Sequence, residues 1–254
     1  MQTQEVKKIM DDNRICVVVP TYNNGDTVVD VINRILKYTD NIILVDDGCT
    51  DNTVQRIKDS GVDNIEIISN ASNKGKGKAL KEGFLKAIKM GYDYAITIDS
   101  DGQHYPEDLP VFIETFVENK DSLIIGSRNL NEDNMPSKNT FANKFSNFWF
   151  FVQTGIHLPD TQTGYRLYPL LKISRNWPLT SRYEAELELL VMSAWRGVDI
   201  IPVKVRVFYP PKEERVSHFR PVADFVRISI LNVGLTLTAL FYGLPRRFLN
   251  RRSK

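Results

Sequence analysis

The first half of the chain alternates short apolar runs with stretches whose apolar residues recur at helical spacing. Four runs have the length and composition of buried strands, at residues 15–19, 42–45, 65–68 and 94–98. Amphipathic stretches separate them, at residues 27–37, 51–57 and 73–90. This order of strand, crossover helix and parallel strand predicts a doubly wound, mostly parallel α/β sheet with helices on both faces.

Polar loops follow three of the predicted strands. Tyr22 follows the first, Asp47 the second, and Asp99 and Asp101 the fourth. Parallel strands bring their carboxyl ends to one edge of the sheet, where open α/β sheets bind ligands. We therefore expect these side chains to line a single cleft.

The stretch Asp99-Ser100-Asp101 ends a buried strand with two carboxylates one residue apart. Carboxylate oxygens suit Mg²⁺ or Mn²⁺, which keep open positions for the phosphate oxygens of a substrate. The alternative is a solvated acidic turn, because an isolated Asp-x-Asp is a weak signal. The position after a strand and the neighbouring polar loops favour the metal site.

Eight blocks of sequence, in order between about residues 15 and 220, resemble family 2 glycosyltransferases of the GT-A fold, in the dolichol-phosphate mannosyltransferase-like branch. The blocks are Val-Pro-Thr-Tyr-Asn at 19–23, Asp-Asp-Gly-Cys-Thr-Asp at 46–51, Asn-Lys-Gly-Lys-Gly-Lys-Ala at 73–79, Asp-Ser-Asp-Gly-Gln-His at 99–104, Gly-Ser-Arg at 126–128, Asp-Thr-Gln-Thr-Gly-Tyr-Arg at 160–166, Tyr-Glu-Ala-Glu-Leu at 183–187 and Ser-His-Phe-Arg at 217–220. The second block carries Cys49 where the family usually has Ser. The resemblance implies sugar transfer from a nucleoside-diphosphate sugar with inversion at the anomeric carbon.

The resemblance also implies roles on the donor side of the site. Tyr22 and Asp47 would contact the nucleobase, and Lys76 would contact the diphosphate at a glycine-rich helix start. Gln103 would be a third metal ligand through its amide oxygen. The expected nucleotide-sugar residues are Pro20, Tyr22, Asn23, Asp47, Lys76, Asp99 and Gln162, and the expected metal ligands are Asp99, Asp101 and Gln103.

On the acceptor side, Arg128 resembles a phosphate-clamping arginine. Further candidate cations for an acceptor phosphate are Lys212, Arg215 and Arg220. An acceptor phosphate is already anionic near neutral pH, whereas a hydroxyl acceptor needs a general base. The branch commonly has Arg-x-x-Gly-x-Ser-Lys where this chain has residues 212–218, so a glycolipid or carbohydrate hydroxyl stays open as acceptor.

Candidate bases are Asp160, Glu184, Glu186 and Glu188. Helical spacing does not choose between Glu184 and Glu186, but the family block aligns Glu186 with its recurrent glutamate. The expected catalytic residues are therefore Asp101, Arg128, Glu186 and Asp160, with a solvated helix face as the alternative for Glu186. The three histidines are too scattered to form a transition-metal site, so none is assigned a ligand role.

Composition favours one catalytic domain over residues 1–220 with an appendage over residues 221–254. The 254 residues are 42% hydrophobic and suffice for one sizeable core. Two cysteines favour a reducing cytoplasm over a disulfide framework, and the polar start, residues 1–13, is unlike a secretory signal.

The positive charge lies at one end of the chain. Residues 204–254 contain 11 Lys and Arg and 3 Asp and Glu, a net charge of +8 against −6 for the rest. Within this end, residues 228–244 are uncharged and followed by arginines, which favours an amphipathic helix lying on an anionic membrane surface. The aromatic-rich stretch 141–151 is expected to face the same surface. Core packing or a dimer interface is the alternative for both stretches, and nucleic acid is not an expected partner.

Together these features predict a metal-dependent, inverting glycosyltransferase that is peripheral to the inner face of the membrane. It would move a hexose from a UDP- or GDP-sugar to a lipid acceptor such as a polyprenyl phosphate, with Mg²⁺ or Mn²⁺ as cofactor and homo-oligomerisation left open. A non-catalytic sugar-nucleotide binding module is the alternative of another class. A sugar-1-phosphate nucleotidyltransferase would carry a glycine-rich, arginine-containing loop after the first strand, and residues 20–24 are not such a loop.

Overall fold

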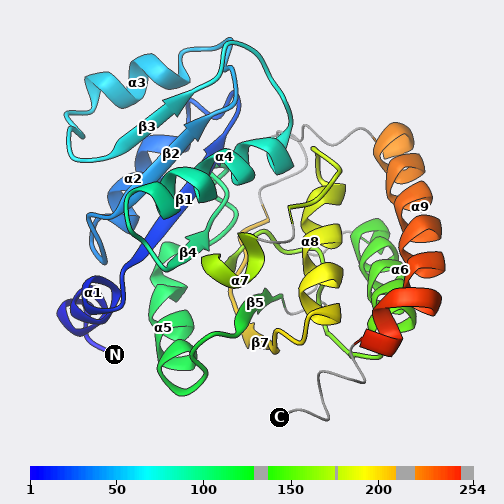
Figure 1. The fold of residues 1–254 in the computed structure, drawn as a ribbon. Coiled ribbons are helices and arrows are strands. Elements are labelled where there is room, and N and C mark those ends of the chain that lie inside the picture. The colour runs from blue at the N-terminus through cyan, green and yellow to red at the C-terminus, as the bar shows by residue number, and fades with distance from the viewer. Residues whose placement is uncertain (129–136, 175–176, 210–220, 247–254) are drawn as a thin grey trace.

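The computed structural model describes residues 1–128, 137–174, 177–209 and 221–246, and only the backbone of 137–141 and 221–225 (Figure 1). Its centre is a seven-stranded sheet with the order β3-β2-β1-β4-β6-β5-β7. The strands are β1 Ile15–Thr21, β2 Ile42–Asp46, β3 Glu66–Ser69, β4 Tyr94–Thr97, β5 Leu123–Ser127, β6 Arg166–Pro169 and β7 Ile200–Lys204. The predicted doubly wound, mostly parallel sheet is confirmed.

One strand breaks the parallel pattern. β6 pairs antiparallel with β4, where Thr97 faces Arg166, and antiparallel with β5, where Ile125 faces the same arginine. All the other pairs are parallel. Because β6 runs against its neighbours, the residues that precede it lie at the edge where β4 and β5 end. The loop at residues 160–165 is thereby brought to the Asp-x-Asp edge.

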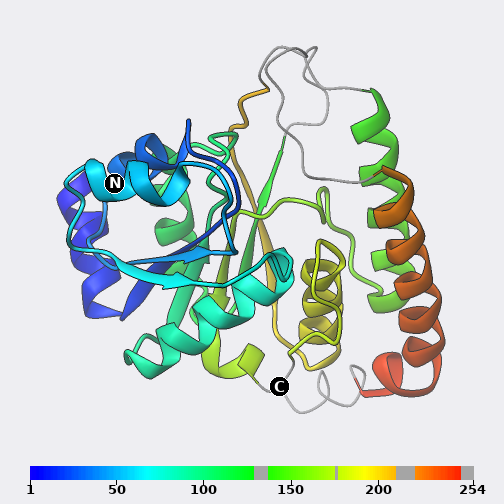
Figure 2. The same ribbon diagram turned by 90° about the horizontal axis from the view of Figure 1, so that it is seen from above.

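Helices cover both faces of the sheet, as Figure 2 shows from above. Alternate residues of β1 point into two separate cores: Cys16 and Val18 pack with α4 and α8, while Val17 and Val19 pack with α1, α2 and α5. The helices are α1 Thr3–Asp12, α2 Val28–Ile35, α3 Thr53–Asp59, α4 Lys76–Lys89, α5 Leu109–Glu118, α6 Ser137–Thr154, α7 Leu170–Ile173, α8 Glu184–Trp195 and α9 Pro221–Thr238, with short 3₁₀ and π turns at Pro106–Asp108 and Ala239–Gly243. Burial on both faces explains why β1 and β2 are apolar up to their last residues, Thr21 and Asp46.

Beyond α8, helices α6 and α9 lie side by side (Figures 1 and 2). Polar side chains join them inside an otherwise apolar contact. The Gln153 amide donates to Asn232 Oδ1 at 3.0 Å and to Thr236 Oγ1 at 3.3 Å, and the Trp195 indole of α8 donates to the Gln153 carbonyl at 2.8 Å. Such bonds fix the position of α9 along α6, because a shift would leave buried polar groups unpaired.

The outer side of α9 carries large exposed apolar residues at helical spacing. We call this set the α9 stripe: Ile230, Val233, Leu237, Leu240 and Phe241, exposed by 56–86%. Phe148 and Phe151 of α6 are also exposed. One stretch, Val226–Arg246, is long and apolar enough to cross a membrane by length and composition, with mean hydropathy 1.5 over its most apolar window and 22% of that window buried. The predicted C-terminal apolar helix is present.

Candidate active site

The Asp-x-Asp turn at the end of β4 is tied to the loop that follows β1. Ser100 Oγ donates to the carbonyl of Pro20 at 3.1 Å and accepts from the Asn24 amide at 2.8 Å. Thr27 Oγ1 donates to the Ser100 carbonyl at 2.6 Å. Asp101 Oδ1 accepts from the backbone N–H of Gln103 at 3.0 Å. The residue between the two carboxylates thus anchors the turn, and both carboxylates belong to a rigid edge.

Lys76, the first residue of α4, lies between two carboxylates. Its Nζ is 2.8 Å from Asp99 Oδ1 and 2.9 Å from Oδ2, and it is 2.9 Å from Glu186 Oε2 of α8. Burial alone would lower the pKa of Lys76, but these carboxylates raise it above its ordinary value. A Cβ on Gly164 would lie 2.6 Å from Lys76 Nζ and 2.7 Å from Asp99 Oδ2. Glycine at this position therefore lets the loop before β6 close over the pair.

The side-chain oxygen atoms at the Asp-x-Asp turn are suitable ligands for a hard divalent cation. Burial and the nearby charge of Asp99 raise the pKa of Asp101 to about 6. A bound cation would relieve the repulsion between the two carboxylates. Among the described residues no three His, Cys, Asp or Glu side chains are grouped to hold an ion alone. Two carboxylates and the amide oxygen of Gln103 would leave positions for phosphate oxygens, as Mg²⁺ and Mn²⁺ require.

Asp47 and Asn23 shape the loops around the expected nucleotide position. Asp47 is 3% exposed and accepts from the backbone N–H groups of Lys74 at 2.9 Å and Gly75 at 2.8 Å. Asn23 adopts φ +53° and accepts from the Thr50 N–H at 2.8 Å. The Asp47 bonds order the residues just before α4, where backbone N–H groups favour an anion, and the Asn23 bond joins the loops after β1 and β2. Contact of Asp47 and the half-buried Tyr22 with a nucleobase stays a prediction.

Arg128 and Asp160, which the sequence places on the acceptor side as an expectation, form a two-point ion pair. Arg128 Nε is 2.6 Å from Asp160 Oδ2, and Nη2 is 3.0 Å from Oδ1. Asp160 is fully buried and also accepts from the Asn143 amide and the Gln162 N–H. Burial alone would raise the pKa of Asp160, but these bonds lower it. These bonds hold Asp160 against Arg128, and its expected role as a base stays a prediction.

The glutamates of α8 differ in their surroundings. Glu188 accepts from the N–H groups of Leu179 and Thr180 at 2.9 and 3.0 Å, so it orders the loop before the helix. Glu186 bonds Lys76 through one oxygen. Glu184 is 6% exposed, and within the described structure its Oε2 has no hydrogen-bond partner. Glu186 itself is 7% exposed, so the alternative that it lies on a solvated helix face is wrong.

Two buried residues near the site were not singled out from the sequence. Arg166 donates to the carbonyls of Glu186 at 2.8 Å and Thr161 at 3.0 Å, joining α8 to the loop before β6. His104 packs on Tyr165, and burial lowers its pKa to about 4. Both fall inside the family blocks, which is the signal that could have identified them. The candidate cations Lys212, Arg215 and Arg220 lie outside the described residues.

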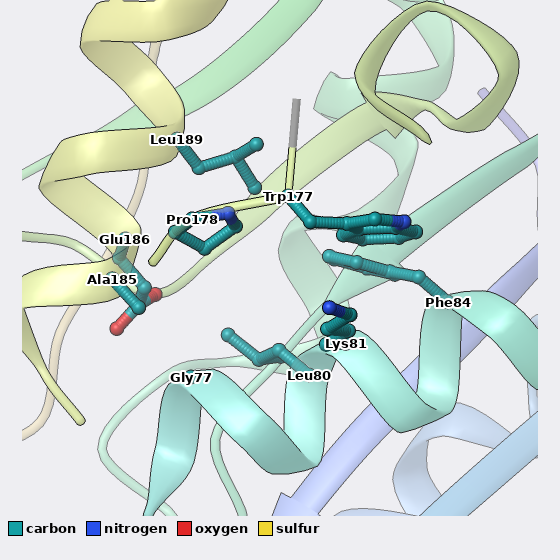
Figure 3. Close-up of a pocket in the computed structure, with 9 residues that line it drawn as sticks. All are labelled: Gly77, Leu80, Lys81, Phe84, Trp177, Pro178, Ala185, Glu186 and Leu189. Carbon is teal, nitrogen blue, oxygen red and sulfur yellow. The ribbon is translucent and has the colours of Figure 1, made fainter. Parts of the chain in front are cut away.

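A shallow pocket between α4 and α8 lies on the other side of Glu186 (Figure 3). Its walls are mostly apolar, with the Trp177 ring stacked on Phe84 at 6.1 Å between centroids. Figure 3 shows Glu186 and Ala185 at one end of this pocket and the rings of Trp177 and Phe84 at the other, with Lys81 beside the rings. We assign it no part in the chemistry, because the charged groups of the site are Asp99, Lys76 and Glu186.

Comparisons with known proteins agree with this geometry. The glycosyl transferase family 2 model matches residues 16–169. The UDP-N-acetylglucosamine–dolichyl-phosphate N-acetylglucosaminyltransferase of Methanococcus voltae is 30% identical, covering 79% of this chain and 88% of its own. The polyprenol monophosphomannose synthase of Mycolicibacterium smegmatis is 27% identical, covering 80% of each chain.

Solved structures show the same fold. Glucosyl-3-phosphoglycerate synthase from Mycobacterium tuberculosis, in complex with Mn²⁺, UDP-glucose and phosphoglyceric acid, superposes with a TM-score of 0.67 at 20% identity, over 94% of this chain and 84% of the other. The sheet, the carboxylate edge and the matched family model lead to one conclusion: the chain belongs to glycosyl transferase family 2, in the branch that resembles dolichol-phosphate mannosyltransferases, and is a glycosyltransferase.

Proposed function

We propose that this protein moves a hexose from a UDP- or GDP-sugar to a polyprenyl phosphate, with inversion and with Mg²⁺ or Mn²⁺. The observation that carries the proposal is Arg128, held by Asp160 at the sheet edge that also carries Asp99 and Asp101. Asp160 occupies the Nε–Nη2 edge of the guanidinium, so a phosphate would bind the remaining N–H groups of a cation whose position is fixed. The names of the relatives in Methanococcus voltae and Mycolicibacterium smegmatis include lipid-phosphate acceptors, which supports the same acceptor class.

The reaction needs stabilisation of negative charge on the departing diphosphate. Asp99, Asp101 and Gln103 would hold the divalent ion, which acts as a Lewis acid on the leaving group when bound. Lys76 and the N–H groups at the start of α4 would bind the same phosphates. Arg128 would orient the acceptor phosphate, whose oxygen attacks the anomeric carbon without a general base.

We further propose that the segment 221–254 associates with the cytoplasmic face of the membrane. The α9 stripe offers apolar side chains to the acyl region, and Arg227 and Arg246 near the ends of the apolar stretch suit anionic head groups. The buried bonds from Gln153 to α9 favour a helix lying along the surface, since they hold it against the catalytic body. A lipid acceptor would then be reached from the surface on which the enzyme rests.

A hydroxyl acceptor is the second candidate. The observation that favours it is that two buried glutamate oxygens, Glu184 Oε2 and Glu186 Oε1, lack a hydrogen-bond partner among the described residues. A carboxylate in such surroundings is suited to take a proton from a hydroxyl.

The test is transfer from radiolabelled UDP-N-acetylglucosamine, UDP-glucose and GDP-mannose to undecaprenyl phosphate, dolichyl phosphate or the corresponding free polyprenols. Each donor is assayed with Mg²⁺, Mn²⁺ or EDTA. We expect metal-dependent labelling of a polyprenyl phosphate and mild acid lability of the product. Labelling of a free polyprenol instead would favour the hydroxyl acceptor. Nucleotide binding without transfer to any acceptor would favour the binding module.

Asp101→Asn serves as the matched loss-of-function variant. It keeps the side-chain shape but removes a metal-ligand charge, so we expect transfer to fall at least about 100-fold. Asp63→Asn, at an exposed loop position between α3 and β3, is the control and should be fully active. Full turnover of Asp101→Asn with saturating Mn²⁺ would refute the metal assignment.

A further inference from the structure

The ammonium of Lys76 contacts the carboxylate that is also the expected metal ligand. It is within 2.9 Å of both oxygens of Asp99, and Glu186 holds it from the opposite side at 2.9 Å. The three side chains come from different elements: the start of α4, the end of β4 and the first turn of α8. The side chains of Lys76 and Glu186 are only 16% and 8% exposed. The position of the ammonium is therefore fixed by the fold.

A divalent ion and this ammonium would compete for the same oxygens. A metal bound to Asp99 would lie about 2.1 Å from a carboxylate oxygen, within a few ångströms of Lys76 Nζ. Two cations at that separation repel each other in a partly buried site, where screening by water is weak. The position of Gly164 strengthens this repulsion, because the glycine packs directly over the pair and limits where the ammonium can move.

A nucleoside diphosphate changes this balance. Its phosphates bring negative charge to the start of α4. Lys76 and the metal are then both attracted to the same phosphates, which lie between them. The lysine can then contact a phosphate oxygen while the metal takes Asp99 and Asp101. Lys76 would thus oppose metal binding in the empty site and favour it in the nucleotide-loaded site.

We propose that Lys76 keeps the divalent cation out of the nucleotide-free site, so that the metal enters together with the nucleotide. The inference rests on the proposed metal site at Asp99. Glu186 contributes by giving the ammonium a second anchor and holding it near Asp99. The variant Lys76→Met tests this, because methionine keeps the length of the stem and removes the charge.

The experiment measures Mn²⁺ binding by electron paramagnetic resonance of free Mn²⁺ at pH 7.5, without nucleotide and with saturating UDP or GDP. Without nucleotide, Lys76→Met should bind Mn²⁺ at least about tenfold more tightly than the wild type. With nucleotide, the same variant should bind it more weakly than the wild type. Lys81→Met, on the same helix with its ammonium over the Trp177 ring, is the control and should match the wild type in both states.

A double variant separates two explanations of the gain. In Lys76→Met/Glu186→Gln the side chain at position 186 carries no charge. Tighter Mn²⁺ binding that persists in this double variant must therefore come from the exposure of Asp99. Loss of the gain would mean that Glu186 itself captures the ion, which would overturn exclusion at Asp99. If Lys76→Met does not fold by circular dichroism, Lys76→Gln replaces it.

Unchanged or weaker nucleotide-free Mn²⁺ binding by the folded Lys76 variant would overturn the inference while leaving the proposed transfer reaction intact. Absence of Mn²⁺ binding in every variant and in both states would overturn the metal assignment as well. Polyprenyl-phosphate labelling is measured separately, so failure of the acceptor assignment is distinguished from both.

Discussion

Gly164 illustrates how a residue without a side chain shapes the site. It lies in the loop before β6, directly over Asp99 and Lys76. Its φ lies outside the left-handed region, so its role is space rather than backbone freedom. Any larger residue would have to displace charged groups whose positions the fold otherwise fixes.

We expect Gly164→Ala to lower transfer at least about tenfold while leaving the protein folded, since misplacing reacting groups by about 1 Å is costly. The added Cβ would lie 2.6 Å from Lys76 Nζ and 2.7 Å from Asp99 Oδ2, so one or both of these charged groups must shift. Initial rates and thermal melting are the measurements. Gly234→Ala is the control, because a Cβ there meets nothing within 4 Å. Wild-type rates for Gly164→Ala would show that the site tolerates the displacement.

The pair Arg128 and Asp160 gives a prediction with two readouts. Asp160→Asn leaves a guanidinium that is 16% exposed without its charged partner, which costs about 3 kcal/mol in the free energy of unfolding. We also expect a higher KM for the lipid phosphate, because Arg128 loses its orientation. Urea unfolding and acceptor titrations measure the two effects.

The matched control is Asp121→Asn. Asp121 pairs with Lys172 at 3.4 Å, and both side chains are about half exposed, so the loss should be at most about 0.5 kcal/mol. If Asp160→Asn were as stable as this control, the buried pair would not hold the loop. A large fall in kcat with unchanged KM would instead favour Asp160 as a base.

At the scale of residues, the sequence predicted which side chains lie together, but it did not predict their hydrogen bonds and ion pairs as well. Asp99 and Asp101 follow the strand that apolar periodicity predicted, and Lys76 and Glu186, which the family resemblance selected, meet Asp99 there. The bond between Lys76 and Glu186 could not be predicted, since the two residues are 110 positions apart and belong to helices whose packing depends on the whole sheet. Burial of Asp160 was missed for the same reason: a carboxylate followed by polar residues looks solvated until its arginine is found.

Among the elements, α4 and α8 meet closely at their amino-terminal ends. A Cβ on Gly77 would lie 2.3 Å from the Ala185 Cβ and 2.9 Å from the Arg182 carbonyl. The N–H of Lys78 donates to the Ser181 carbonyl at 3.0 Å. The close approach brings Glu186 within reach of Lys76, so helix spacing here determines the charge arrangement of the site.

Gly77→Ala should therefore force the two helices apart. We expect a loss of about 1–3 kcal/mol in the free energy of unfolding, as for overpacked cores, together with weaker UDP or GDP binding. Chemical denaturation and calorimetric titration check the two effects. Lys81→Ala, on the half-buried side of the same helix, should change stability by less than about 1 kcal/mol. A stable Gly77→Ala with normal nucleotide affinity would show that α4 and α8 adjust freely.

Elements differed in how far sequence could predict them. β1 and β2 were predicted within two residues because strands buried on both faces are continuously apolar. β6 was not predicted: its four residues begin with Arg166, a charge that is fully buried because it bonds to backbone carbonyls. The amino-terminal helix α1 was also missed, since only Val6 and Met10 of its ten residues are buried.

The molecule as a whole has a catalytic body and an apolar, arginine-flanked side. The α9 stripe and the exposed aromatics of α6 lie on the two helices packed beyond α8 (Figure 2). Inner positions of α9, including Leu235 and Ala239, belong to the core. The core-packing alternative is thus confirmed for the inner positions of this helix, and the membrane-surface expectation for its exposed positions stays a prediction.

We expect Leu237→Ser/Phe241→Ser to lower binding to anionic vesicles at least about tenfold, because each side chain contributes about 1.5–3 kcal/mol when buried from water. Phe241 is 86% exposed and Leu237 56%, so the fold should be unaffected. Co-sedimentation with phosphatidylglycerol vesicles measures binding, and gel filtration measures oligomeric state.

The control is Leu171→Ser, an exposed apolar residue of α7 on a different part of the molecule. It should bind vesicles as the wild type does. Unchanged vesicle binding of the double variant, with conversion of a dimer to a monomer, would assign the stripe to contact between two copies.

The antiparallel direction of β6 has a wider consequence. The chain leaves the sheet edge at Arg128 and returns to it at Asp160, and the bond between these two residues closes the excursion at its base. The described part of this excursion contributes a helix, α6, and no strand, and that helix packs on α8 and α9. A segment from a relative, grafted between this arginine and this aspartate, would therefore leave every strand pairing in place, provided that it keeps those helix contacts.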